Sequence, residues 1–391
     1  MTTPASPRVA FVVGLASGGT ASHVAALAAG CQDAGLEVSV LGPAPTLALL
    51  GQSGCGAAAV KASAAVKTSA AVRTYQVGIA DRVRPGSAVT AVSALRSAIA
   101  AWRPDVVDAH GVRAGALAVL AIAFLGRRSR PALVVTVHNA PPDDRAARLV
   151  YGLLERICAR RANLVLCASA DLLARMRRLG AADAQQSDVP AGPVRPPLAA
   201  EIAKARADIG AGDRPVLLTV ARLAPQKGLD VLIAAAARWR DRDPQPRTVI
   251  AGDGPLAAEL RAQASQAGVD VLLIGARRDV PALLAIADVV IVPSRWEARA
   301  LIVQEAMQSG RPIIATRVGG IPELTGDDGA LLVRPDDAAA LAAAVTTVLD
   351  DPALSARLST AASARSASFP AKEDAIRAAV STYARLAIGR S

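Results

Sequence analysis

Short apolar runs rich in β-branched residues alternate with longer helical patterns along this chain of 391 residues. Runs that are largely apolar and lie between helices are typical of a parallel sheet covered by helices on both faces. The chain is therefore predicted to be an α/β protein with doubly wound, Rossmann-like sheets. The predicted strands occupy residues 9–14, 37–42, 104–110, 132–139, 163–169, 216–221, 248–254, 271–275, 289–294, 312–316 and 330–333.

The alternation is interrupted in the segment SDVPAGPVRPPLA at 187–199, where four prolines and a glycine disfavour both helix and strand. The hydrophobic content of 52% is sufficient for two separate cores. We therefore predict an N-terminal domain at 1–190, a linker at 191–200 and a C-terminal domain at 201–370.

Two further segments carry structural predictions. Residues 371–391 have helical periodicity, with Ile376, Val380, Tyr383 and Ala387 on one side, and we expect this helix to pack back on the N-terminal domain. Residues 44–74 are low in complexity, and we expect them to form a surface excursion without a chemical role.

The charge balance favours an anionic partner. The formal net charge is +11, which suits nucleic acid, an acidic lipid surface or a phosphorylated small molecule. Aromatic residues make up only 2% of the chain and the basic residues are dispersed, so few stacking platforms are available for nucleic acid. We therefore expect no nucleic-acid partner and consider peripheral contact with an anionic membrane.

The cysteines and the apolar runs bear on the compartment. Cys31, Cys55, Cys158 and Cys167 have no metal-ligand spacing, and we expect them to be reduced and mostly buried. The longest apolar run, GALAVLAIAFLG at 115–126, is shorter than the roughly 20 residues that span a bilayer. The first apolar run resembles a buried strand more than a signal sequence, so we expect a cytoplasmic protein.

All three histidines of the chain are expected at the carboxyl ends of strands in the first domain. His110 ends PDVVDAH, His138 ends VVTVH, and His23 begins the helix after the loop GLASGG. Ligands bind at this edge of open α/β sheets, and a glycine loop before a helix, here Gly18 and Gly19, offers amides to an anion. The alternative for each histidine is a structural role, and for the glycines a tight turn.

Two cations follow the first strand of the second domain. In VARLAPQKG, Arg222 comes directly after the strand and Lys227 stands at the start of the next helix. Two cations at one strand end suit a diphosphate, although both residues could instead be solvated surface charges. The pair Asp241 and Asp243 ends a polar helix, and we interpret it as solvated surface rather than as a metal site.

The segment SRWEARALIVQEAM at 294–307 contains two glutamates eight residues apart. Glu297 is expected in the loop after a strand and Glu305 about one turn inside the following helix, so that they could contact different parts of one ligand. The amides of Ala300 and Leu301 would begin that helix and could bind a phosphate. The alternative is an ordinary helix-surface charge at Glu305 and an acid favoured by the helix dipole at Glu297.

In order, the motifs GGTASHV, VDAHGVRAG, TVHN, VARLAPQKG, AGDGP, the glutamate pair and ATRVGGIPEL resemble glycosyltransferase family 4 over nearly the whole chain. These are retaining enzymes of the GT-B fold, in which two Rossmann-like domains face a central cleft. The resemblance implies transfer of a hexose from a nucleotide-diphosphate sugar to a lipid, glycan or small molecule, without a metal or other cofactor. Retention would come from front-face attack, with no obligatory enzyme nucleophile.

The resemblance also implies roles for individual residues. Arg222 and Lys227 would neutralise the donor diphosphate, Glu305 would bind the ribose, and Glu297 would contact hydroxyls of the transferred sugar. His138 would lie near the anomeric carbon and act with Glu297 in catalysis. The Gly18 and Gly19 loop would approach the phosphates, and the residues assigned to the acceptor side are His23, His110 and Arg113.

The sequence departs from the family after the first glutamate. Where the family often has Gly-Phe-Gly or Pro-Phe-Gly, this chain has Ala298, Arg299 and Ala300. We therefore expect Arg299 to reach the donor phosphate or an anionic acceptor. The competing functions are a GT-B nucleotide-sugar epimerase, which shares the architecture, and a non-catalytic nucleic-acid-binding protein.

Overall fold

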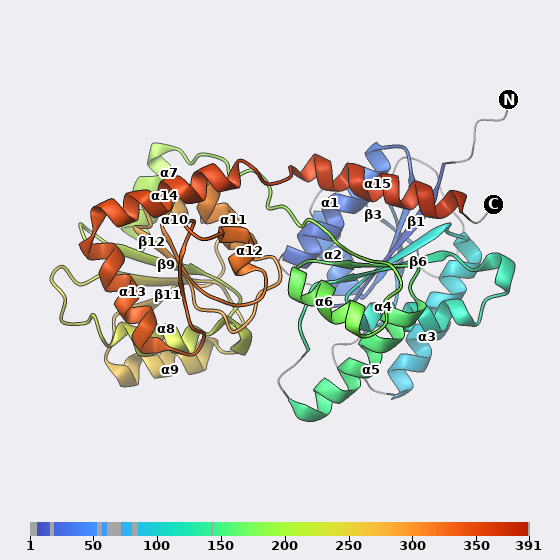
Figure 1. Cartoon of the computed structure of the whole chain (residues 1–391), viewed down its shortest axis with the longest axis horizontal. Helices are drawn as coiled ribbons and strands as arrows, with labels where there is room; N and C mark the ends of the chain where they lie inside the picture. The colour runs from blue at the N-terminus through green and yellow to red at the C-terminus, as the bar shows by residue number, and fades with distance from the viewer. Residues whose placement is uncertain are drawn as a thin grey trace. The chain divides into compact units, whose positions relative to one another are not determined.

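The computed structural model describes residues 6–15, 19–52, 57–60, 72–79, 85–141 and 144–389. The chain divides into two compact units (Figure 1). Unit 1 comprises Met1–Val189 and Pro370–Ser391, and unit 2 comprises Pro190–Phe369. The division therefore falls between Val189 and Pro190, and the C-terminal helix is part of unit 1.

Unit 1 is built on a parallel sheet with the strand order β3-β4-β2-β1-β5-β6-β7-β8. Its strands are β1 Arg8–Val13, β2 Glu37–Gly42, β3 Ala57–Val60, β4 Val72–Gln76, β5 Val106–His110, β6 Ala132–Val137, β7 Leu164–Cys167 and β8 Ala184–Gln186. Its helices are α1 Gly19–Asp33, α2 Ala44–Gln52, α3 Pro85–Trp102, α4 Val112–Ala123, α5 Arg145–Arg161, α6 Ala170–Arg178 and α15 Lys372–Ile388, with a 3₁₀ turn η1 at Arg127–Ser129.

Unit 2 has a second parallel sheet, with the order β11-β10-β9-β12-β13-β14. Its strands are β9 Val216–Val220, β10 Arg247–Ala251, β11 Val271–Leu273, β12 Val289–Val292, β13 Ile313–Thr316 and β14 Leu331–Val333. Its helices are α7 Ala199–Asp208, η2 Pro225–Lys227, α8 Leu229–Ala236, α9 Ala257–Ala267, α10 Val280–Ile286, α11 Leu301–Gln308, α12 Ile321–Thr325, α13 Ala338–Asp350 and α14 Pro352–Ser366.

The central strands of unit 2, β9, β10, β12 and β13, are buried on both faces, whereas β11 and β14 at the sheet edges are partly exposed. Along β12, Val290 and Val292 belong to a core that includes α7, α10 and α11, whereas Val289 and Ile291 belong to a core that includes α8, α9 and α13. Successive side chains of a strand point to opposite faces, so an uninterrupted apolar run is what a sheet between two helical layers requires. The prediction of doubly wound sheets is confirmed for this unit.

Helix α15 packs against α1, on the core of unit 1 formed by β1, β2 and β5. A Cβ on Gly30 of α1 would fall 2.5 Å from the Cδ1 atom of Ile376, so a side chain at this position would separate the two helices. Ile376, Val380 and Tyr383 of α15 lie in the same core, and Tyr383 is 1% exposed. Helix α15, drawn in red in Figure 1, therefore completes the first unit although it follows the second unit in sequence.

The prediction of a surface excursion at 44–74 is wrong for the part of it that the structure describes. Residues 44–52 form α2, and β4, which begins at Val72, lies between β2 and β3 in the sheet. Val72 is 1% exposed. The alternation of buried and partly exposed residues in β4 is short and follows a stretch of alanines and serines, which obscured the strand signal.

The segment predicted as a linker lies with unit 2. The amides of Ala191 and Val194 donate to the side-chain oxygens of Gln304 and Gln308 on α11, at 3.0 and 2.9 Å. These bonds satisfy backbone donors that a proline-rich segment cannot satisfy in a helix or a sheet.

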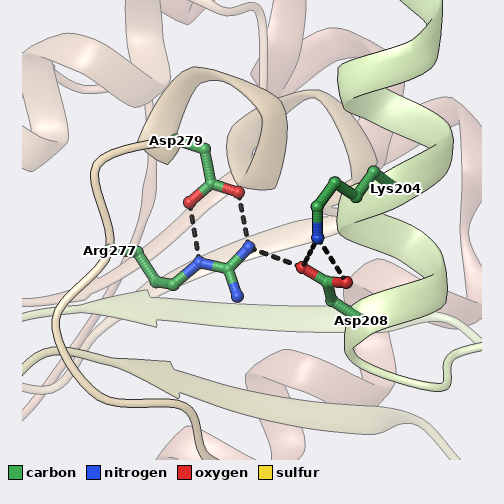
Figure 2. Close-up of polar contacts among 4 residues, drawn as sticks. All are labelled: Lys204, Asp208, Arg277 and Asp279. Carbon is green, nitrogen blue, oxygen red and sulfur yellow. Dashed lines mark hydrogen bonds and ion pairs between the residues drawn. The ribbon is translucent and has the colours of Figure 1, made fainter.

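A group of ion pairs joins α7 to the start of α10 (Figure 2). Arg277 donates through Nε and Nη2 to the two carboxylate oxygens of Asp279, at 2.7 and 2.5 Å, and through Nη2 to Asp208 at 3.0 Å. Lys204 approaches Asp208 from one turn earlier on α7, at 2.8 Å. The guanidinium lowers the pKa of Asp279 by direct hydrogen bonding. This group supports the local packing of two helices and includes no residue of the predicted site.

In the described part of the chain, no single helix is long and apolar enough to cross a bilayer. Helices α13 and α14 reach that length and composition only as a pair bent by 101°.

Candidate functional site

The predicted donor residues of unit 2 lie around the point where the strand order reverses. β9 is flanked by β10 on one side and β12 on the other, and the loops after β9 and β12 carry Lys227 and Glu297. At such a switch point the two loops diverge, which leaves room for a ligand beyond the strand ends.

Glu297 is buried and held through one of its carboxylate oxygens. Lys227 Nζ lies 2.6 Å from Oε1, and the hydroxyl of Ser294 donates to the same oxygen at 2.7 Å. The residue is 7% exposed. Among the residues that the structure describes, none donates to Oε2. The carboxylate is thus oriented and charge-compensated, and its second oxygen is able to accept a hydrogen bond from a ligand hydroxyl.

Hydrogen bonds to its backbone carbonyls hold the loop that carries Glu297 in place. The side-chain amide of Gln226 donates to the Trp296 carbonyl at 2.7 Å, and the Gly320 amide donates to the Glu297 carbonyl at 2.9 Å. Gly319 has φ 50°, and a Cβ at this position would lie 1.8 Å from the Glu297 carbonyl oxygen. Only glycine allows the loop after β13 to approach Glu297 this closely.

Arg222 is exposed at the end of β9. No hydrogen bond or ion pair of its side chain to another described residue is present, so its charge is available. Lys227, by contrast, is engaged by Glu297, with 23% of its side chain exposed. Sequence reasoning placed both cations in the site but did not foresee that Lys227 compensates the charge of the Glu297 carboxylate.

Helix α11 begins at Leu301, with Ala300 as its N-terminal flanking residue, as expected. Its first amides have no partner within the helix and point along the axis at its positive end. Glu305 lies on the second turn and is partly buried, and this desolvation raises the pKa of its carboxyl. No side chain in the described ranges pairs with it, so Glu305 also has free acceptor capacity.

Arg299 is engaged inside unit 2. Its side chain is 9% exposed, its Nη1 lies 3.2 Å from Glu323 Oε1, and its guanidinium lies 5.9 Å from the centre of the Phe369 ring. Through these contacts, Arg299 connects the loop before α11 with the end of unit 2. The expected contact of Arg299 with a donor phosphate or an acceptor stays a prediction, and nothing in this geometry supports it.

The three histidines of unit 1 form one cluster. His110 Nδ1 and His138 Nε2 are 3.0 Å apart in stacked rings, and the His23 ring centre lies 6.0 and 5.7 Å from those of His110 and His138. All three are buried. The expectation that they share the carboxyl edge of the sheet is met by this geometry.

A buried acid behind the cluster was missed by sequence reasoning. Asp108 on β5 is 0% exposed and accepts hydrogen bonds from Thr136 at 2.8 Å and from Tyr383 of α15 at 2.6 Å. One of its oxygens lies 3.5 Å from His110 Nε2. A lone acid within the apolar run VVDAH was the available signal, because a buried carboxylate needs dedicated partners.

Gly18, Gly19 and Arg113 are the remaining residues of the predicted site. Gly18 lies outside the described residues, and Gly19 is the first residue of α1. Arg113 lies on α4 and is partly exposed.

Cys31, Cys158 and Cys167 are free and buried, and burial raises the pKa of each thiol to about 12. Cys55 falls outside the described ranges, within which no three His, Cys, Asp or Glu side chains are grouped as metal ligands.

We expect acid to destabilise the protein through these histidines. Burial lowers the pKa of His23 to about 3 and that of His138 well below 6.5. The unfolded chain therefore binds more protons than the folded chain below pH 6.5, and stability is lost as the pH falls through this window. Between pH 7 and pH 5 the loss should be about 2 kcal/mol for each histidine that stays neutral.

Urea denaturation at pH 7 and pH 5 measures this loss, with His23→Gln as the matched variant. The variant should show a smaller difference between the two pH values. Glu305 acts in the opposite direction, because its raised pKa adds stability at low pH, and it is present in both proteins. An unchanged difference in the variant would contradict the assignment to His23.

Two family models match the two halves of the chain in order. The model described as glycosyl transferase 4-like domain matches residues 18–192, and the model described as glycosyl transferases group 1 matches residues 201–365. The chain belongs to these glycosyl transferases. The resemblance to glycosyltransferase family 4 is thereby confirmed.

Curated glycosyltransferases match parts of the chain. It is 33% identical over 171 residues to the alpha-D-kanosaminyltransferase of Streptomyces kanamyceticus, covering 40% of this chain and 42% of that protein. It is 37% identical over 172 residues to the GDP-mannose-dependent alpha-(1-6)-phosphatidylinositol monomannoside mannosyltransferase of Mycolicibacterium smegmatis, covering 41% and 45%. The chain thus spans less than half the length of these relatives.

A solved structure shares the fold over nearly the whole chain. HepE of Anabaena, in complex with UDP and glucose, aligns with a TM-score of 0.77 at 20% identity, covering 96% of this chain and 99% of HepE. The prediction of a GT-B fold with two Rossmann-like domains is therefore confirmed.

Proposed function

We propose that the chain transfers a hexose from a nucleotide-diphosphate sugar to an acceptor hydroxyl, with retention at the anomeric carbon. The observation that carries the proposal is the buried Glu297 carboxylate, which Lys227 and Ser294 hold by one oxygen while the other oxygen stays open. A fixed acceptor beside a cation at the switch point of unit 2 suits a sugar hydroxyl next to a diphosphate.

The proposed roles follow the charges. The exposed Arg222 and the partly buried Lys227 would neutralise the diphosphate. The first amides of α11 at Ala300 and Leu301 would bind a phosphate oxygen, and Glu305 would accept from the ribose hydroxyls. These fixed charges stabilise the leaving diphosphate, which supports a reaction without a metal.

In the transfer step, the acceptor oxygen forms a bond to the anomeric carbon on the face from which the diphosphate oxygen leaves. The acceptor proton passes to the departing phosphate oxygen, so no enzyme nucleophile is required. His138 would lie beside the anomeric carbon, with His23, His110 and Arg113 toward the acceptor. Burial lowers the pKa of His138 and keeps its ring neutral near pH 7, which suits hydrogen bonding to a sugar rather than charge stabilisation.

Binding experiments can identify the nucleotide of the donor sugar. HepE is named in complex with UDP, and the mycobacterial relative is named as GDP-mannose-dependent. Calorimetric titration with UDP, GDP and ADP and with their sugars should therefore show binding of one nucleoside diphosphate, and Lys227→Ala should weaken it about tenfold or more. Absence of binding to every member of this panel would contradict the proposal.

Product analysis separates transfer from the competing epimerase activity. A transferase should release nucleoside diphosphate in proportion to glycosylated acceptor. Formation of an isomerised or hydrolysed sugar at the same rate without acceptor would instead indicate an epimerase.

The proposed acceptor is a hydroxyl of a lipid, a glycan or a small molecule. The net charge of +11 supports a place beside an anionic membrane, and unit 1 contains a surface that fits one.

A further inference from the structure

Unit 1 contains a groove of about 1020 Å³ at the amino end of β6, between α4, α5 and the end of α15. It reaches Pro131 and Ala132, where β6 begins, whereas His138 follows the other end of that strand. At about 3.3 Å per residue, the six residues of β6 separate the groove from the histidine cluster by roughly 20 Å. The groove is therefore distinct from the proposed transfer site.

The floor of the groove is apolar and open to solvent. Leu120 is 44% exposed and Leu153 is 60% exposed, and Leu149, one turn before Leu153 on α5, is 78% exposed. Large aliphatic side chains grouped in this way are uncommon on a surface that contacts only water. The apolar side chains that line the groove include Val119, Leu120, Leu153, Ile157 and Leu386.

The rim of the groove is cationic. It consists of Arg130, Arg156, Arg160, Arg161 and Arg385, and no acidic residue lines the groove. Within the described residues, the side chains of Arg156, Arg160, Arg161 and Arg385 form no hydrogen bond or ion pair. The nearby Glu155 does not compensate them, because it is fully buried and paired with Arg175 at 2.6 Å.

We infer that this groove binds anionic phospholipid at a membrane surface. Guanidinium groups on the rim match lipid phosphates, and the leucine floor matches the first carbons of an acyl chain. No aromatic side chain lines the groove, so it offers no platform for stacked bases. A second copy of the chain on the same surface would bring arginine against arginine.

Cosedimentation of the full chain with vesicles tests this inference. Binding should be strong to vesicles of equal parts phosphatidylcholine and phosphatidylglycerol, weak to phosphatidylcholine alone, and reduced at 0.5 M salt. The double variant Arg156→Glu, Arg160→Glu should lower the partition coefficient about 25-fold or more, from about fivefold for each arginine removed. Leu153→Ser should lower it roughly tenfold through the apolar contact.

The matched control is Arg261→Glu, Arg357→Glu, which changes net charge equally at two exposed sites of unit 2. It should keep most of the binding. Equal losses in both double variants, or equal binding to uncharged vesicles, would overturn the inference. The inference would also be overturned if the protein bound a short RNA but no vesicles, and if the groove variant abolished that RNA binding.

The inference goes beyond the transfer chemistry, and the two are measured separately. Nucleoside diphosphate titration of the same samples reports the site of unit 2, and circular dichroism reports the fold. Loss of vesicle binding with intact nucleotide binding locates the effect in the groove, whereas loss of nucleotide binding with intact vesicle binding bears only on the proposed function.

Discussion

Glu297→Gln is expected to lower kcat/KM for sugar transfer by about 10²- to 10³-fold. The substitution keeps the size of the side chain and an oxygen that can accept from Ser294 and Lys227, but it removes the charge. In the native site that charge is buried beside Lys227 at 2.6 Å, and none of the described residues donates to Oε2. Loss of the negative charge weakens the hydrogen bond to a sugar hydroxyl as positive charge develops at the anomeric carbon.

The measurement is steady-state transfer with the donor identified by titration, together with the affinity for the free nucleoside diphosphate. Because Glu297 is assigned to the sugar, the loss should appear mainly in kcat, and nucleoside diphosphate affinity should stay within about threefold. Glu259→Gln, at an exposed position on α9, is the matched control and should be unaffected. Transfer by Glu297→Gln at near the native rate would remove Glu297 from the mechanism.

Gly319→Ala is expected to lower the free energy of unfolding by about 3 kcal/mol or more and to abolish most transfer. The residue has φ 50°, and its new Cβ would lie 1.8 Å from the Glu297 carbonyl oxygen, a backbone atom that cannot rotate away. Relief requires movement of the loop that orients Glu297. Stability and activity should therefore fall together.

Gly268→Ala separates the effect of the left-handed backbone from the effect of the steric contact. Gly268 also has a left-handed backbone, with φ 61°, but nothing lies within 4 Å of its added Cβ. It should lose only the conformational component, about 1 kcal/mol, and keep full transfer activity. Urea denaturation of both variants measures the difference. Similar losses would mean that the close approach to Glu297 has no energetic consequence.

The strongest structural predictions came from local patterns. The run VAFVV predicted β1 and VVIV predicted β12, because a strand buried on both faces must be apolar at every position. The strands β3 and β8 were missed, since Ala57–Val60 has a single branched residue and Ala184–Gln186 has none. The strand β4 was missed because its short alternation follows a stretch of alanines and serines. β3 and β8 are the two edge strands of the sheet and β4 lies next to β3, so each is identified by its pairing with a neighbouring strand rather than by its own sequence.

In the candidate site, too, local patterns predicted single residues but not the contacts between them. Glu297 and Lys227 were both predicted, because each follows a strand at the edge where ligands bind. Their ion pair was not predicted, since it joins residues 70 positions apart through the adjacency of β9 and β12. Arg299 was predicted to contact a ligand from its place between two glutamates, and this stays a prediction. Its contacts with Glu323 and Phe369 in unit 2 were not predicted.

By itself, the sequence determined which residues reach the strand ends, because apolar periodicity and glycine positions act over a few neighbouring residues. The tertiary structure alone decided which of these residues meet. Tyr383 donates to Asp108 across 275 positions, and the three histidines converge from α1, β5 and the end of β6. Such contacts depend on strand order and on the return of α15 to unit 1, which are set by the packing of whole elements rather than by any local pattern.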